Sequence, residues 1–111
     1  MSMGYYKLVN KKPVPATVDE LESILEDGDS RKVAVTCIGI ATVSTVFLGL
    51  DHSFGDTTPI LFETLVFGGL KDGYMLRYAT WEEAENGHKD VVKEVMECEG
   101  IHDNGEALTE F

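Results

Sequence analysis

The sequence has few cysteines, no long apolar segment and no targeting signal, and each absence excludes a class of protein. Two cysteines in 111 residues are too few for a disulfide framework. No Cys-x-x-Cys pair or Cys/His cluster indicates structural zinc. No apolar run reaches the ~20 residues that span a bilayer, and residues 1–5 lack the basic region and apolar core of a secretion signal. We therefore expect a reduced, cytoplasmic protein without a membrane segment, metal or cofactor.

Basic side chains are also scarce. Nine Lys and Arg oppose 20 Asp and Glu, so the net charge is −11. Residues 97–111 contain five acidic side chains and no Lys or Arg. Binding to a nucleic-acid backbone needs clustered basic residues, so this charge argues against it. The charge is compatible with solubility alone, with a basic partner or with imitation of a polyanion.

Two segments have the pattern of a capped amphipathic helix. Each begins with a Thr that has a Glu three residues later, the capping box in which both side chains satisfy free backbone donors. These pairs are Thr17 with Glu20 and Thr80 with Glu83. The apolar residues that follow recur at helical spacing, and Gly28 and Gly100 are expected to end the two helices.

The remaining apolar segments predict strands. Residues 5–15 are expected to form a short edge hairpin. The strand segments that follow are 32–37, 42–50, 60–67 and 74–78. The last three are joined without helix signals, which favours an antiparallel meander. In the 32–37 segment, the alternation predicts that Val33, Val35 and Cys37 share the buried face.

These elements predict an α+β domain, a two-layer sandwich in which two helices cover a mainly antiparallel sheet of four to five strands. Residues 1–97 are expected to form the domain and 98–111 an acidic, flexible tail. The 60–67 segment is apolar on both faces, so one face needs a further cover. A homodimer or a curled sheet would supply it.

Asp51 and His52 are adjacent candidates for binding at the end of a strand. Loops at strand ends carry binding groups in many proteins, and an Asp beside a His can tune the imidazole or join a metal site. In the alternative, Asp51 accepts hydrogen bonds from the loop backbone and His52 packs on Phe54.

Glu63 is the second candidate, because it alternates with Leu65 and Phe67 and is expected to point into an apolar face. A carboxylate there needs a partner, and Arg77 on the next strand is the expected one. The pair is either structural or holds an anionic ligand, with Tyr78 beside it.

His88 lies on the apolar face of the second helix, where a lone histidine is more often a satisfied core residue than a ligand. Three histidines without paired spacing do not define a metal site. Ser and Cys residues lack the pattern of a nucleophile elbow, and no phosphate-binding glycine motif occurs.

Three segments resemble motifs of a family of small phage and prophage proteins of uncharacterised function. The motifs are STVFLGLDHSFG at 44–55, PILFETLVFGG at 59–69 and RYATWEEAENGH at 77–88. The resemblance extends over most of residues 5–95. It includes the candidate residues Asp51, His52, Glu63, Arg77 and His88. It implies a phage accessory protein made in the bacterial cytoplasm, and because the family is uncharacterised, no catalytic role can be carried over from it.

Three hypotheses follow. The first is non-enzymatic binding to a host or phage factor. The second is sequestration of a small anionic ligand, such as a nucleotide immune signal, around Arg77, Tyr78 and the 51–58 loop. The third is a metal-dependent hydrolase that uses Asp51, His52, Glu63 and His88.

Overall fold

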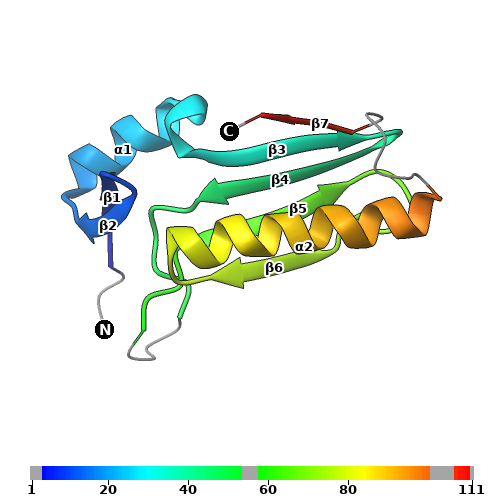
Figure 1. The fold of residues 1–111 in the computed structure, drawn as a ribbon. Coiled ribbons are helices and arrows are strands. Elements are labelled where there is room, and N and C mark those ends of the chain that lie inside the picture. Colours follow the sequence, from blue (N-terminus) through cyan, green and yellow to red (C-terminus); the bar gives the residue numbers. More distant parts are fainter. Residues whose placement is uncertain (1–3, 54–57, 101–106, 111) are drawn as a thin grey trace.

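The chain forms an α+β structure with two sheets and two α-helices (Figure 1). The structure, a computed structural model, describes residues 4–53 and 58–100, and 107–110 as backbone. Its elements are β1 (Tyr6–Val9), β2 (Lys12–Pro15), α1 (Val18–Glu26), the 3-10 turn η1 (Gly28–Arg31), β3 (Lys32–Ile38), β4 (Ala41–Phe47), β5 (Phe62–Phe67), β6 (Met75–Tyr78), α2 (Trp81–Glu99) and β7 (Ala107–Glu110). The predicted fold class is confirmed.

The main sheet is antiparallel throughout and has the order β6-β5-β4-β3-β7. Strands β3 to β6 form the expected meander, whereas β7 comes from the acidic C-terminal segment and pairs with β3. From the sequence, we expected residues 98–111 to form a tail outside the domain. The expected domain boundary, residue 97, lies within α2. Backbone pairing to the free edge of β3 accounts for the difference, because an edge strand accepts any segment with free donors and acceptors. The other tail residues, 101–106 and 111, lie outside the described residues.

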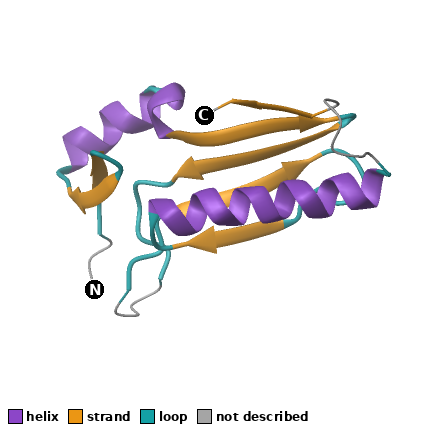
Figure 2. Cartoon of the chain, in the orientation of Figure 1, coloured by secondary structure: helices purple, strands orange, loops and turns teal. Residues whose placement is uncertain are grey.

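Helix α2 covers one face of the sheet and runs along the direction of the strands (Figure 2). Both capping boxes form as expected, and Gly100 ends α2 in the left-handed conformation with φ 70°. Helix α1 contributes differently from α2: it packs on β1 at one end of the sheet and reaches the core through Ile24. No helix among the described residues has the length and apolar content needed to cross a bilayer.

The core lies between α2 and the sheet and has two clusters. One contains Ile38, Ala41, Val43, Val66, Val91 and Val95; the other contains Val33, Phe47, Leu61, Phe62 and Ala84. A shift of register between Lys32 and Ala34 in β3 lets two successive residues, Val33 and Ala34, be buried. After this bulge, Thr36 is buried, whereas Cys37 is exposed on the opposite face. The predicted burial of Val35 and Cys37 with Val33 is therefore wrong.

The short hairpin β1–β2 reverses at Asn10 and Lys11, which both have positive φ (51° and 67°). Two left-handed residues in succession give the turn whose twist matches that of antiparallel strands. Lys11 adopts this conformation without being glycine, and the turn directs the hairpin tip toward the start of α2, where Lys11 meets Trp81.

Candidate functional site

The six residues predicted as ligand-binding lie in three separate places. Asp51 and His52 are in the loop between β4 and β5, Glu63 and Arg77 lie on the sheet face away from α2, and Tyr78 and His88 lie between the sheet and α2. Neighbouring residues of a strand point to opposite faces, so Arg77 and Tyr78 cannot enter one pocket. The six therefore do not share a single cavity.

Asp51 and His52 organise the loop that precedes β5. The Oδ1 atom of Asp51 accepts hydrogen bonds from the amides of Ser53 (2.8 Å) and Ile60 (3.0 Å). Burial alone would raise the pKa of Asp51, but the amides of Ile60 and Ser53 outweigh it, and the pKa is lowered. The Nδ1 atom of His52 lies 2.8 Å from the carbonyl oxygen of Leu50, the geometry of a ring N–H that donates to the backbone. Both side chains thus hold the backbone of this loop in place. Phe54, the expected neighbour of His52, lies outside the described residues.

Glu63 and Arg77 form the predicted pair. The Nε atom of Arg77 donates to Oε2 of Glu63 at 3.1 Å, and the two residues are directly opposite each other on β5 and β6. Both side chains remain partly exposed. The expected apolar face exists, but α2 lies on the other side of the sheet, so Glu63 is not buried in the core. The pair is available at a surface.

His88 is fully enclosed and is the centre of a polar network. Its Nε2 atom lies 2.8 Å from the hydroxyl of Thr36 and its Nδ1 atom 2.7 Å from the hydroxyl of Thr45, which in turn lies 2.5 Å from the hydroxyl of Thr64. Burial lowers the pKa of His88 to about 4, so the ring is neutral at pH 7. A neutral imidazole donates from one nitrogen and accepts at the other, which matches hydroxyls on both sides. His88 therefore ties α2 to the sheet and is shielded from any substrate.

Tyr78 lies beside the same network. Burial raises the pKa of its phenol, and the neighbouring hydroxyl of Thr64 opposes this rise. The Tyr78 hydroxyl is buried and does not meet the geometry of a hydrogen bond with a described residue. The ring lies against Gly87 of α2, where a Cβ atom would come within 2.3 Å of it. This contact explains why α2 contains a glycine despite its cost of about 1 kcal/mol to the helix.

The part of the chain that the structure describes contains no set of residues that could bind a metal ion. Within 4–53 and 58–100, no three His, Cys, Asp or Glu residues lie close enough to hold an ion. The four residues of the hydrolase hypothesis are distributed over the three places described above.

The sheet surface away from α2, here named the open face, is the largest candidate for binding. Its residues alternate with the buried residues along β3, β4, β5 and β6, and they lie opposite one another on adjacent strands. Its residues are Lys32, Val35, Cys37, Thr42, Ser44, Val46, Glu63, Leu65, Phe67, Met75 and Arg77. Phe67 is 51% exposed and Met75 45%, whereas Phe62 of the same strand as Phe67 has no exposure. No described helix covers this face.

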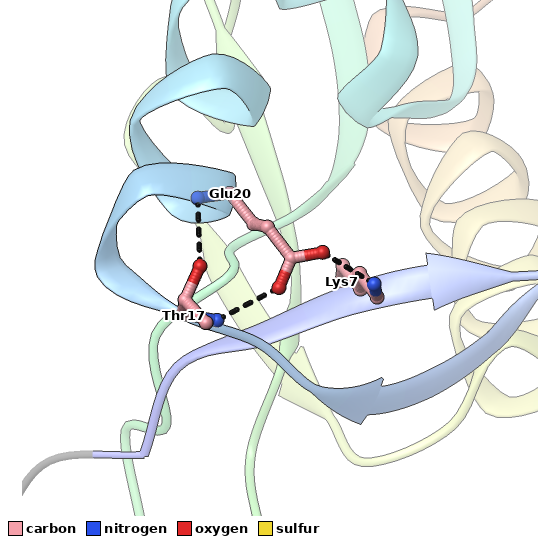
Figure 3. Close-up of polar contacts among 3 residues, drawn as sticks. All are labelled: Lys7, Thr17 and Glu20. Carbon is pink, nitrogen blue, oxygen red and sulfur yellow. Dashed lines mark hydrogen bonds and ion pairs between the residues drawn. The ribbon is translucent and has the colours of Figure 1, made fainter.

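Two cavities lie near the hairpin. One of about 330 Å³ lies between β1, α1 and the end of β4. At its edge, the ammonium of Lys7 bonds to the carboxylate of Glu20, and this bond, with the Thr17 amide, lowers the pKa of Glu20 (Figure 3). Glu20 also belongs to the capping box of α1, so these charges are already engaged with each other.

The second cavity, of about 460 Å³, is a groove between the hairpin tip and the first turns of α2. Its lining residues are Asn10, Lys11, Lys12, Pro13, Thr80, Trp81, Glu82 and Glu85. Sequence reasoning missed this groove because its two sides are about 70 residues apart in the chain and only the fold joins them. The adjacent lysines and the single tryptophan were the available signals.

Comparison with known proteins adds no family assignment: no family model, no curated protein and no solved structure matches the chain.

Proposed function

We propose that this chain is a non-enzymatic accessory protein that binds a protein partner, a phage factor or a factor of the bacterial host cell, through the open face of its sheet. The observation that carries the proposal is the group of apolar side chains on that face, of which Phe67 and Met75 are exposed and Leu65 is partly buried. Large apolar side chains gathered on one exposed surface mark interaction sites in many proteins. The resemblance of three sequence segments to phage proteins motivates the setting.

Charge distribution favours the same surface. Within β3 to β6, the open face carries the paired Glu63 and Arg77 near its centre and Lys32 at the start of β3, which lies opposite Val46 and pairs with Asp29. Helix α2 carries seven acidic and two basic residues, a net charge of −5, on the other side of the sheet. A partner therefore meets an apolar, neutral centre in a strongly acidic protein. Basic residues around the partner's own apolar patch would speed association and make it dependent on salt.

The size of the open face indicates a transient complex. Four strands, β3 to β6, spaced by about 4.8 Å and six residues rising about 3.3 Å each give a surface of roughly 19 by 20 Å, or about 400 Å² in projection. Stable interfaces bury about 800 Å² on each partner. The sheet alone falls short of that area, so the rim has to contribute or the complex stays short-lived.

Site-specific photocrosslinking tests the proposal. The full chain is produced in bacteria with p-benzoylphenylalanine in place of Met75, on the open face, or in place of Leu70, in the turn after β5. Leu70 is 77% exposed and Met75 only 45%. Crosslinking that follows exposure alone would favour position 70, whereas a specific interface favours position 75. We expect a discrete product of one partner from position 75 that disappears when Phe67→Glu is added.

Two outcomes would contradict the proposal. Equal or stronger labelling from position 70 would mean that the open face has no special affinity. A product with twice the mass of the chain would identify a second copy of the chain, and not a host or phage factor, as the occupant. Circular dichroism of each variant verifies that the fold is retained.

A further inference from the structure

We propose that the groove between the hairpin tip and α2, here named the tip groove, binds a small aromatic anion, for which a nucleoside monophosphate is the type ligand. The groove is lined by residues 10–13 and by Thr80, Trp81, Glu82 and Glu85. Its volume of about 460 Å³ lies in the range of small-molecule sites, which is roughly 300–1,000 Å³. It is separate from the open face and independent of the function proposed above.

Trp81 supplies a platform for an aromatic ring. Its indole packs edge-on against Phe62, with the centroids 6.2 Å apart and the planes at 89°, so the core fixes its orientation. The ammonium of Lys11 lies over the indole, 5.4 Å from the ring centroid. A planar ligand ring takes the place of this ammonium on the indole, as nucleobases stack on aromatic side chains.

Lys11 and Lys12 supply the positive charge. Neither forms an ion pair with a residue of the described ranges, although the chain has an excess of acidic side chains. The turn at Asn10 and Lys11 fixes both lysines at the tip of the hairpin. When a ring displaces the Lys11 ammonium, that ammonium and Lys12 are free to pair with the anionic group of the same ligand.

The capping box engages part of the start of α2. The hydroxyl of Thr80 accepts from the amide of Glu83, and the Glu83 carboxylate accepts from the amides of Ala79 and Thr80. The positively charged side chains that line the groove are those of Lys11 and Lys12, so their contribution to anion binding is testable by substitution.

Glu82 and Glu85 restrict the class of ligand. They balance the two lysines, so the groove as a whole is neutral and unsuited to a polyanion such as a nucleic-acid strand. Their carboxylates can accept hydrogen bonds from hydroxyl or amino groups, as acidic residues do from ribose in dinucleotide sites. A nucleoside monophosphate has a single anionic group at one end and hydrogen-bond donors elsewhere. These groups match the two lysines and the two glutamates of the groove.

Fluorescence of Trp81 gives a direct readout, because it is the single tryptophan of the chain. The full chain is titrated at low ionic strength with AMP, adenosine, benzoate or inorganic phosphate. We expect saturable quenching by AMP, about tenfold weaker binding of adenosine, and no quenching by phosphate. The double variant Lys11→Gln/Lys12→Gln should weaken AMP binding about tenfold and leave adenosine binding unchanged.

Lys89→Gln is the matched control, because it removes a positive charge from the exposed side of α2 and leaves the groove intact. It should bind AMP as the parent protein does. The inference is overturned if AMP gives no saturable change, if AMP and adenosine bind equally, or if Lys89→Gln weakens AMP binding as much as the double variant. Benzoate that binds as tightly as AMP would show that a ring and an anion suffice and that the role given to Glu82 and Glu85 is wrong.

Discussion

The two faces of the main sheet use the same strands for different purposes. In β5, Phe62, Thr64 and Val66 face α2 and are buried, while the alternate residues form part of the open face. On the covered face, the hydroxyls of Thr36, Thr45 and Thr64 form one hydrogen-bond network with a neutral His88. The open face carries the ion pair of Glu63 and Arg77, whose side chains are partly exposed. The covered face therefore fixes the position of α2, whereas no described helix packs on the open face.

The largest expected difference between the faces is in stability, and two phenylalanines of β5 measure it. Phe62→Ala removes a fully buried ring and should lower the free energy of unfolding by about 3–5 kcal/mol. Phe67→Ala removes a ring that is 51% exposed and should cost less than about 1 kcal/mol. Urea denaturation of the two variants measures both values. Equal losses would mean that the open face is buried in the free protein, through self-association or by the residues that the structure does not describe.

Acid should weaken the covered face through His88. Its pKa is about 4 in the fold against an ordinary value of 6.5, so between these values the unfolded chain binds more protons. The stability is therefore complete above pH 6.5 and decreases as the pH falls, by ~3 kcal/mol at pH 4.

His88→Gln is the matched control for this pH dependence. Glutamine keeps a donor and an acceptor for Thr36 and Thr45 but does not titrate. Unfolding free energies of both proteins, measured in steps from pH 7 to pH 4.5, should show a steeper decline for the parent. Parallel curves would contradict the assigned burial of a neutral imidazole, since carboxylates such as Asp51 titrate equally in both proteins.

The elements of the fold were predictable because local signals agree with tertiary packing. The capping boxes at Thr17 and Thr80 locate both helices, and the alternation in β4 and β5 locates the central strands. The pairing of Glu63 with Arg77 also followed, because residues opposite each other on adjacent strands are constrained by register.

The faces of the strands were harder to predict. In β3, hydrophobicity favoured Val35 and Cys37 for the core over Thr36, but Thr36 is buried because His88 satisfies its hydroxyl. A residue 52 positions away along the chain thus decides which face is inside, and no local pattern contains that information. The tip groove depends equally on distant segments. Its lysines and its tryptophan acquire a common role only after the hairpin folds against α2.

The smallest expected effect concerns the ion pair of the open face. Both side chains are partly exposed, so Glu63 and Arg77 should contribute less than about 1 kcal/mol to stability, and salt should reduce even that. A double-mutant cycle with Glu63→Gln and Arg77→Gln, measured at low and at high salt, gives the coupling directly. A coupling above about 2 kcal/mol that salt leaves unchanged would mean a desolvated pair. The open face would then be covered in the isolated protein, which would remove the main contrast between the two faces and the basis for assigning the partner to the open one.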